Sequence, residues 1–211
     1  MDTGKIIAQR LLQIKAIKLS PQNPFTWASG IKSPIYCDNR IALSYPDVRN
    51  DIQHGLSGKI NAFGDIQMIS GVATAGIAHG AILADRLGLP FSYVRASAKS
   101  HGRQNKIEGE IPEGARILVI EDLISTGGSS LEVVSTLRES GYEVAGVLAI
   151  FNYGFKKAEE KFLKSSCKYI SLTDYPVLIS VALESGYISK SESAVLNDWN
   201  KDPDGWYDQN F

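Results

Sequence analysis

Two adjacent carboxylates precede a cluster of hydroxyl and glycine residues in the segment VIEDLISTGGSS, residues 119–130. Glu121 and Asp122 follow an apolar run, and a turn-like stretch from Ser125 to Ser130 comes next. Small residues that lead into a helix offer backbone N–H groups to a phosphate. Carboxylates repel phosphate, so we expect their partners to be neutral hydroxyls or a magnesium ion brought by the substrate. A cis-diol followed by a phosphate describes a ribose 5-phosphate.

A simpler interpretation of these residues is a capped helix preceded by two solvated acids. Other phosphate-binding classes are disfavoured. The chain contains no G-x-x-x-x-G-K-[ST] motif and no G-x-G-x-x-G after a predicted strand, which argues against P-loop and dinucleotide sites.

The elements that must position this segment alternate between short apolar runs and helical periods. Runs that are apolar on both faces and joined by helices are typical of a parallel sheet covered on both sides. We therefore predict an α/β fold with a doubly wound, mostly parallel sheet flanked by helices. The expected strands are 66–70, 91–95, 116–120, 144–151 and 168–172, and the expected helices are 75–87, 129–140 and 156–164.

Both ends of the chain are expected to form helices outside this core. An opening amphipathic helix should end near Leu19, another should cover 46–60, and one should follow Pro176. Ser189 and Glu192 predict a capping box for a last helix through about Trp199. We expect a single domain over 1–211, with an N-terminal hood segment 1–60, a core 61–155 and a C-terminal cover 156–211. The tail 201–211 is expected to be loosely ordered unless its aromatic residues dock.

Composition excludes several function classes. The chain has 211 residues and a net charge of -1, so no global field attracts nucleic acid or an anionic membrane. Cys37 and Cys167 are far apart, which argues against a disulfide framework or structural zinc and favours a cytoplasmic location. The charged N-terminal segment resembles neither a signal peptide nor a membrane span.

Three segments resemble one known family. VIEDLISTGGSS resembles the phosphoribosyl diphosphate (PRPP) signature of type I phosphoribosyltransferases. FTWASGIKSPIYCDNR, residues 25–40, resembles the substrate segment of the orotate phosphoribosyltransferase family, and YVRASAKSHGRQNKIEG, residues 93–109, resembles its mobile basic loop. The resemblance implies transfer of ribose 5-phosphate from PRPP to orotate, in pyrimidine (UMP) biosynthesis, with Mg²⁺ held mainly by the substrate and no metal ligand predicted in the protein.

The resemblance also implies roles for individual residues. Asp122, Lys99 and His101 would be catalytic, and the two loop residues would act in the neighbouring subunit of a homodimer with shared sites. Orotate would contact Phe25, Lys32, Ser33 and Ser125. The residues expected to bind PRPP are Arg95, Lys99, His101, Glu121, Asp122, Leu123, Ile124, Ser125, Thr126, Gly127, Gly128 and Ser129.

The basic loop supports this assignment independently. Segment 96–114 is too long and polar for an ordinary connection, and such loops are usually lids or disordered. A departing diphosphate needs cations that close over it and exclude water. A solvated basic loop is the alternative. GVATAG, residues 71–76, resembles the family's diphosphate loop, in which Gly71 and Gly76 would permit close backbone approach.

Three cations of the better-known enterobacterial pattern are missing, since Ala28, Ala75 and Ala96 stand at their positions. Arg103 or Lys106 would replace them, or PRPP would bind less tightly. An orotate-contacting Arg near Asn152 and Tyr153 is also expected to be absent. Two rivals remain: a phosphoribosyltransferase for another base such as a purine, and a non-catalytic PRPP-binding regulator.

Overall fold

The structure is a computed structural model that describes residues 2–27, 30–95 and 106–210. It divides into two compact units, which are described one at a time. The first unit comprises Met1–Arg49 and Thr173–Phe211, and the second comprises Asn50–Leu172. Both ends of the chain therefore belong to one unit, and the predicted nucleotide segment belongs to the other.

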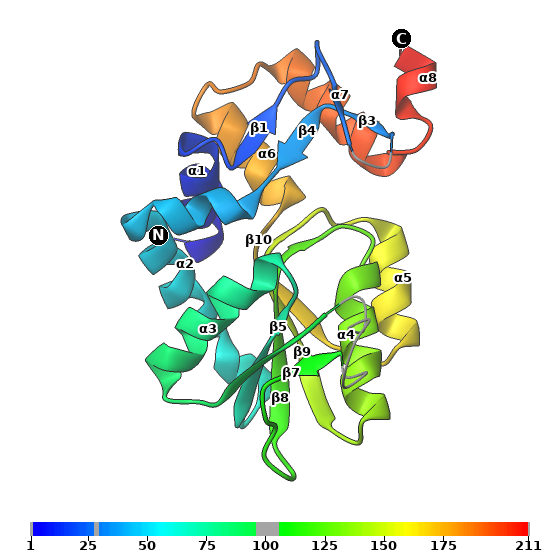
Figure 1. Ribbon diagram of the computed structural model, residues 1–211. Coiled ribbons are helices and arrows are strands. Elements are labelled where there is room, and N and C mark those ends of the chain that lie inside the picture. Colours follow the sequence, from blue (N-terminus) through cyan, green and yellow to red (C-terminus); the bar gives the residue numbers. More distant parts are fainter. Residues whose placement is uncertain (1, 28–29, 96–105, 211) are drawn as a thin grey trace. The chain divides into compact units, whose positions relative to one another are not determined.

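A six-stranded sheet forms the centre of the second unit, in the order β10-β9-β8-β5-β6-β7 (Figure 1). The pairs β5–β6, β5–β8 and β8–β9 are parallel, and only the edge pair β6–β7 is antiparallel among those with a described register. The predicted mostly parallel α/β sheet is confirmed. Its strands are β5 (Met68–Val72), β6 (Phe91–Val94), β7 (Ile107–Glu108), β8 (Arg116–Ile124), β9 (Glu143–Asn152) and β10 (Tyr169–Asp174).

Helices cover both faces of this sheet, as a doubly wound fold requires. Helix α3 (Ala75–Leu87) lies on one side, and α4 (Gly128–Glu139) and α5 (Lys156–Lys164) lie on the other (Figure 1). Alternate residues of β8 serve the two faces, because successive strand side chains point in opposite directions. Val119 belongs to the core beneath α4, whereas the side chain of Ile120 approaches Gly80 of α3.

Several predicted helix boundaries follow directly from local chemistry. Helix α3 ends where predicted because Gly88 takes the left-handed conformation and caps it. Helix α7 (Lys190–Lys201) begins with the predicted capping box, in which Ser189 and Glu192 bond to each other's backbone. The helix predicted over 46–60 is α2 (Pro46–Lys59), continued by a short 3-10 turn, η2 (Ile60–Phe63).

Three predicted boundaries were wrong. Helix α1 (Thr3–Gln13) ends well before Leu19, because Lys15 adopts a positive φ of 58° and the chain then forms strand β1 (Ile17–Leu19). The segment 96–114 is not a continuous loop, since it contains β7. Strand β8 continues four residues beyond the predicted end and includes Glu121 and Asp122.

The first unit is built from both ends of the chain. Helix α1 packs on α6 (Tyr175–Glu184), and β1 pairs with β4 (Ile35–Cys37). Strands β2 (Phe25–Thr26) and β3 (Lys32–Ser33) form a second antiparallel pair, and η1 (Asn39–Ser44) leads to α2. Trp199 of α7 is fully buried and contacts the rings of Trp27 and Tyr175.

The C-terminal tail is ordered as a short helix, α8 (Trp206–Asn210). The side chain of Trp206 is only 2% exposed, so this aromatic residue docks into the first unit. None of the helices in the described part of the chain combines the length and the apolar character that a membrane span requires.

Gly146 is expected to tolerate no side chain. It lies beside an irregularity in the β8–β9 register with φ 153°, and an added Cβ would collide with the Lys168 carbonyl oxygen and lie 2.7 Å from the Phe63 ring. Gly146→Ala should therefore lower the free energy of unfolding by about 2–4 kcal/mol, measured by urea titration.

Gly58→Ala is the matched control for this substitution. Gly58 lies inside α2, and among the described residues nothing stands within 4 Å of an added Cβ. Alanine should stabilise the protein there by about 0.5–1 kcal/mol. Equal effects of the two substitutions would contradict the packing described for Gly146.

Candidate active site

The two acids lie within β8 and not in the loop after it. Glu121 pairs in register with Ala149 of β9, and the strand continues to Ile124. Glu121 is only 4% exposed, whereas Asp122 is half-buried. The two neighbouring carboxyl groups are therefore in different environments at the carboxyl end of the sheet, where open α/β folds bind ligands.

The carboxyl group of Glu121 is bonded to the first turn of α4. Its Oε2 accepts hydrogen bonds from the hydroxyls of Ser129 at 3.2 Å and Ser130 at 3.0 Å. Its Oε1 accepts the backbone N–H of Asp122 at 3.1 Å. Glu121 thus ties the start of α4 to the end of β8. Ser130 is fully buried, and sequence reasoning missed this residue because nothing in its position distinguishes it from Ser129.

Burial is the largest of the effects that together raise the pKa of Glu121 from 4.5 to about 8, followed by the charge of Asp122 and a hydrogen bond with its carboxyl group. The Ser130 hydroxyl and the Asp122 N–H oppose this effect more weakly. At neutral pH Glu121 therefore holds a proton, beside the negative charge of Asp122 that helps to raise its pKa. The pair brings one negative charge to the site instead of two, which removes much of the conflict with a neighbouring anion.

The turn after β8 has the geometry predicted for an anion site. Gly127 precedes α4 with a left-handed φ of 72°, and the first internal bond of the helix runs from the Leu131 N–H to the Gly127 carbonyl. The N–H groups before Leu131 point out of the helix end, where the helix dipole favours an anion. The residues of the turn that are exposed are Thr126, Gly128 and Ser129, and Ser125 is half-buried.

The two glycines of this turn have different surroundings, so glycine is required at the two positions for different reasons. A Cβ on Gly127 would lie 2.9 Å from the ring of Phe162, which belongs to α5. A Cβ on Gly128 would have only the Thr126 hydroxyl near it, at 3.9 Å. Gly127 is needed for packing, and only Gly128 leaves open space for a ligand.

The carboxyl ends of β8 and β9 lie side by side after Asp122 and consist of paired backbone and buried aromatic rings. Leu123 and Ile124 pair with Phe151 and Asn152 of β9, so these two predicted PRPP residues can contribute only through their backbone or as packing. Asn152 accepts the N–H of Gly154, and Tyr153 is 2% exposed in a stack of aromatic rings. Neither Asn152 nor Tyr153 has a cationic side chain like the arginine of the enterobacterial pattern.

The two glycines of the loop 71–76 face protein backbone, whereas the resemblance implied that they permit close approach in a diphosphate loop. A Cβ on Gly71 would lie 2.9 Å from the Gly76 carbonyl oxygen, and a Cβ on Gly76 would collide with the carbonyl oxygen of Ile120. Both glycines therefore allow β5, α3 and β8 to come together. Ala75 stands where the enterobacterial pattern has a cation. It is the first residue of α3 and is half-buried.

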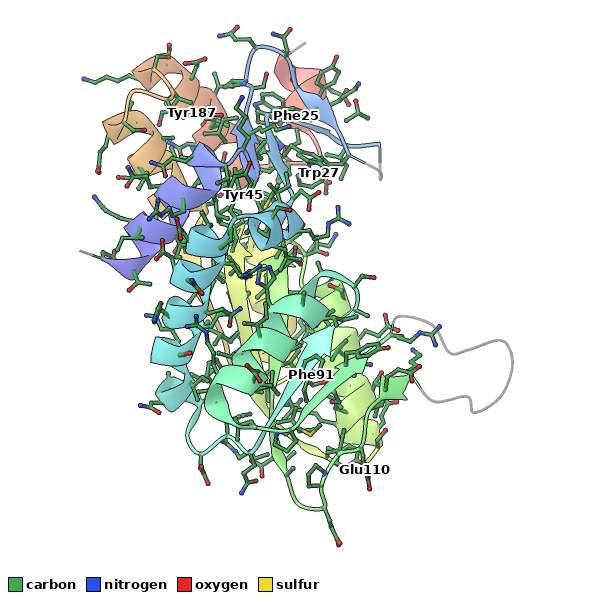
Figure 2. All side chains as sticks on the ribbon, turned by 60° about the vertical axis from the view of Figure 1, so that its left-hand side comes forward. Phe25, Trp27, Tyr45, Phe91, Glu110 and Tyr187 are labelled. Atoms are coloured by element: carbon green, nitrogen blue, oxygen red, sulfur yellow. The ribbon has the colours of Figure 1, made fainter. Side chains whose placement is uncertain are left out.

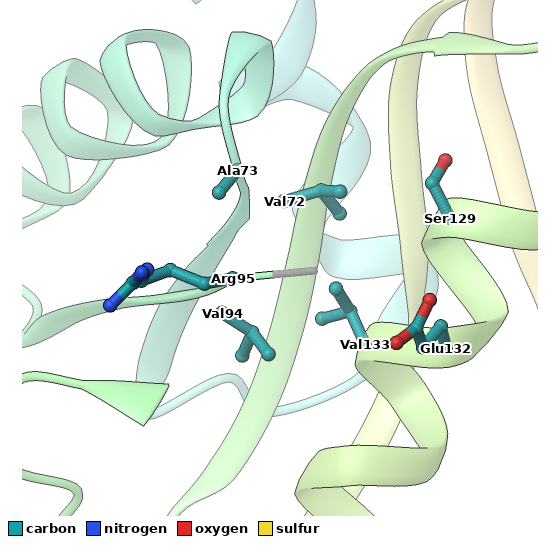
Figure 3. Close-up of a pocket in the computed structure, with 7 residues that line it drawn as sticks. All are labelled: Val72, Ala73, Val94, Arg95, Ser129, Glu132 and Val133. Atoms are coloured by element: carbon teal, nitrogen blue, oxygen red, sulfur yellow. The ribbon is translucent and has the colours of Figure 1, made fainter. Parts of the chain in front are cut away.

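Arg95 lies at the end of β6, beside this loop. It lines a cavity of about 30 Å³ (Figure 3), together with Val72, Ala73, Val94, Ser129, Glu132 and Val133. That volume is about one water molecule, so the cavity marks where three segments meet and cannot itself hold a diphosphate. Figure 3 shows the guanidinium turned away from Ser129 and Glu132, and its Nη1 lies 3.3 Å from Glu108 Oε1.

The basic loop is described only at its two ends. Lys99, His101, Arg103 and Ala96 lie outside the described residues, as does Ala28 of the substrate segment. The two ends are joined by the Arg95 N–H, which donates to the Lys106 carbonyl oxygen at 2.9 Å. Lys106 Nζ forms an ion pair of 2.8 Å with Glu132 of α4. This proposed substitute cation is therefore already paired with a carboxylate.

The predicted orotate residues of the substrate segment lie in the first unit, on the hairpin β2–β3. Phe25 is half-buried and its ring lies 5.8 Å from that of Tyr36, an exposed aromatic residue that sequence reasoning missed. Figure 2 labels Phe25 and Trp27 on this hairpin. Lys32 is half-buried, whereas Ser33 is fully buried and its hydroxyl donates to the Ile35 carbonyl oxygen at 2.8 Å. Ser33 thus shapes the turn that follows it.

The site suits a metal ion only if other ligands come with it. The described residues contain no group of three or more His, Cys, Asp or Glu side chains that could hold a metal ion. Magnesium is often bound through one or two carboxylates together with substrate oxygens and water. The half-buried Asp122 fits that limited role.

The comparisons with known proteins first define a class. The sequence pattern of the phosphoribosyl transferase domain matches residues 45–184. This stretch contains β8, the turn and α4, and it continues through α6.

Curated relatives then define the family within that class. The chain is 52% identical over 204 residues to orotate phosphoribosyltransferase of Porphyromonas gingivalis, covering 96% of this chain and 97% of that protein. It is 54% identical over 197 residues to the Staphylococcus saprophyticus orotate phosphoribosyltransferase, covering 93% and 97%. The crystal structure of orotate phosphoribosyltransferase from Aeropyrum pernix matches with a TM-score of 0.75 and 27% identity, over 87% of this chain and 99% of that one. The chain therefore belongs to the orotate phosphoribosyltransferase family.

The raised pKa of Glu121 predicts how folding stability depends on pH. A carboxyl group with a higher pKa in the folded than in the unfolded protein stabilises the fold at low pH, and this contribution is lost as pH rises through the folded pKa. Relative to Glu121→Gln, the wild type should lose at most about 1.4 kcal/mol of unfolding free energy per pH unit between pH 4.5 and 8. Urea titrations of both proteins across this range measure the difference, and a difference independent of pH would contradict the protonated state of Glu121.

Proposed function

We propose that this chain transfers the ribose 5-phosphate group of PRPP to N1 of orotate, giving orotidine 5′-monophosphate and diphosphate in pyrimidine (UMP) biosynthesis. The observation that carries the proposal is the order of groups at the end of β8: a carboxyl pair with one charge, then a turn of small residues that opens α4. The orotate phosphoribosyltransferases that match over nearly the whole chain support the same reaction.

The turn after β8 would bind the 5′-phosphate. Backbone N–H groups at the start of α4 face an incoming anion, and the hydroxyls of Ser125, Thr126 and Ser129 add donors. Leu123 and Ile124 would contribute backbone. The open space over Gly128 allows the phosphate to approach the chain closely. Ser125 would also reach the orotate.

The carboxyl pair would hold the ribose. Asp122 accepts hydrogen bonds from the ribose hydroxyls, and its negative charge stabilises the positive charge that develops at C1′ as the bond to diphosphate breaks. The bonding electrons leave with the diphosphate oxygen, N1 of orotate forms the new bond from the opposite face, and the N1 proton is released. Glu121, which is buried and protonated, would serve the ribose mainly by fixing the start of α4 beside Asp122.

Cations would stabilise the departing diphosphate. Arg95 stands at the strand end beside the loop 71–76, and Lys99 and His101 would come from the neighbouring subunit of a homodimer. Mg²⁺ carried by PRPP would neutralise the diphosphate, with Asp122 as the protein carboxylate nearest to the ribose. We place the enzyme in the cytoplasm, where cysteines such as Cys37 and Cys167 stay reduced.

The hairpin β2–β3 would receive the orotate. Phe25 supplies an aromatic surface for a planar base, and the ammonium group of Lys32 matches the orotate carboxylate. Ser33 supports this hairpin from within, because its hydroxyl is bonded to the backbone of Ile35.

The base specificity can be tested with a panel of nucleobases. Purified protein is incubated with PRPP, Mg²⁺ and one of orotate, uracil, adenine, guanine or hypoxanthine, and the nucleotide product is separated and identified. We expect orotidine 5′-monophosphate with orotate and at least about tenfold less product with each other base, since a cationic hairpin favours an anionic base. Preferential use of a purine, or binding of PRPP without any turnover, would contradict the proposed function.

The shared site can be tested with two inactive variants. Lys99→Ala and Asp122→Asn are each expected to lose most of their turnover while keeping the wild-type melting temperature. If Lys99 acts in the neighbouring subunit, half of the dimers in an equal co-expressed mixture carry one intact site of two, so about a quarter of the wild-type turnover should return. Absence of any recovery in verified mixed dimers would contradict a site shared between subunits.

A further inference from the structure

Lys32 differs from Arg95 and Lys106, the other cations of the proposed site that the structure describes, in the partners that hold it. Arg95 and Lys106 each form an ion pair with a carboxylate. Lys32 Nζ instead donates to the Thr26 hydroxyl at 2.7 Å and lies 5.8 Å from the centre of the Tyr207 ring. Within the described residues Lys32 forms no ion pair, so both of its partners are neutral.

We propose that Tyr207, on the C-terminal helix α8, is a positioning residue that holds the Lys32 ammonium group for the carboxylate of orotate. This inference rests on the proposed function, which assigns Lys32 to the orotate site, and adds to it a residue close to the opposite end of the chain. The helix α8 would then be a functional part of the base site and not a passive tail.

Neutral partners suit a lysine that must bind an incoming anion. A carboxylate partner would have to be displaced by the substrate, whereas the face of an aromatic ring attracts the ammonium group without neutralising it. The cross-strand register pairs Thr26 with Lys32, so the hydroxyl meets the ammonium group directly across the hairpin. Two contacts restrict a long side chain before the substrate arrives, which reduces the entropy lost on binding.

Both sides of this contact are fixed within the same compact unit. On the helix side, Trp206 is 2% exposed. Its backbone N–H donates to the carbonyl oxygen of Asp202, and the backbone N–H of Gly205 donates to the Asp202 carboxylate. On the hairpin side, Trp27 donates its indole N–H to the Ile35 carbonyl oxygen at 3.1 Å. The Trp27 ring also meets the edge of the buried Trp199 at a centroid distance of 5.8 Å. The ring of Tyr207 is therefore presented to Lys32 by two anchored elements.

The test compares Tyr207→Ala with Tyr207→Phe in steady-state kinetics. Loss of an exposed cation–π contact should raise the KM for orotate about two- to five-fold in Tyr207→Ala. The KM for PRPP and kcat should not change, because the contact concerns only the base site. Tyr207→Phe keeps the aromatic face and should restore the wild-type KM for orotate.

Tyr187→Ala is the matched control. Tyr187 is a tyrosine of the same unit that is 44% exposed, whereas Tyr207 is half-buried, and it is labelled in Figure 2. Its removal should leave both KM values unchanged. An unchanged KM for orotate in Tyr207→Ala, or an equal increase in Tyr207→Phe, would overturn the proposal. A rise in both KM values with a lower melting temperature would also overturn it, since this pattern indicates a purely structural role.

The variant Lys32→Met shows whether a negative result concerns only the role of Tyr207 or the proposed function as a whole. Lys32→Met should raise the KM for orotate by more than Tyr207→Ala does, and adding Tyr207→Ala to it should produce no further increase. If Lys32→Met has the expected effect but Tyr207→Ala has none, only the role of Tyr207 is wrong. If the wild-type protein makes no nucleotide from orotate, the proposed function itself is wrong.

Discussion

The central constraint in this protein is that two carboxyl groups stand immediately before the turn that we propose as the phosphate site. If both were ionised, they would repel an anion there. Burial of Glu121 beside Asp122 resolves the conflict, because the buried group keeps its proton although the Ser130 hydroxyl opposes this effect. One charge remains, on Asp122, where a sugar with a developing positive charge would need it. The hydroxyls of Ser129 and Ser130 tie the start of α4 to β8.

Close packing around this turn depends on glycines that face protein instead of ligand. Gly76 accommodates the carbonyl oxygen of Ile120, and Gly127 accommodates the ring of Phe162. These contacts set the distance between β8 and the helices on its two faces, so the turn cannot shift without repacking both faces. Gly128, the next residue of the turn, instead borders open space. The surroundings therefore hold the turn in place, while its outer residues Thr126, Gly128 and Ser129 stay exposed.

Three described cations, Arg95, Lys106 and Lys32, are of two kinds according to their partners. Arg95 and Lys106, at the ends of the basic loop, are each held by a carboxylate, which orients them but lowers the charge they present. Lys32 is held by a hydroxyl and an aromatic ring and keeps its full charge. The difference is suited to the ligands: a diphosphate carries enough charge to compete with a carboxylate, whereas the single carboxylate of a base does not.

The sequence alone determined the fold class, most element positions and the order of groups along β8 and its turn. These are local properties: apolar periodicity, the capping box at Ser189 and the left-handed cap at Gly88 depend on neighbours a few residues away. The resemblance in three separate segments was enough to point to the family. The sequence did not predict that strand β8 continues past Ile120. Asp and Glu are depleted in strands, so two adjacent acids indicated the end of the strand.

Tertiary structure decided what each of these residues does. The proton on Glu121 depends on its burial and on the neighbouring Asp122. The need for glycine at position 127 depends on the ring of Phe162 in another helix. The contact between Lys32 and Tyr207 joins residues near opposite ends of the chain. Charge state, close approach and long-range contact all depend on distances in space, which sequence spacing does not contain.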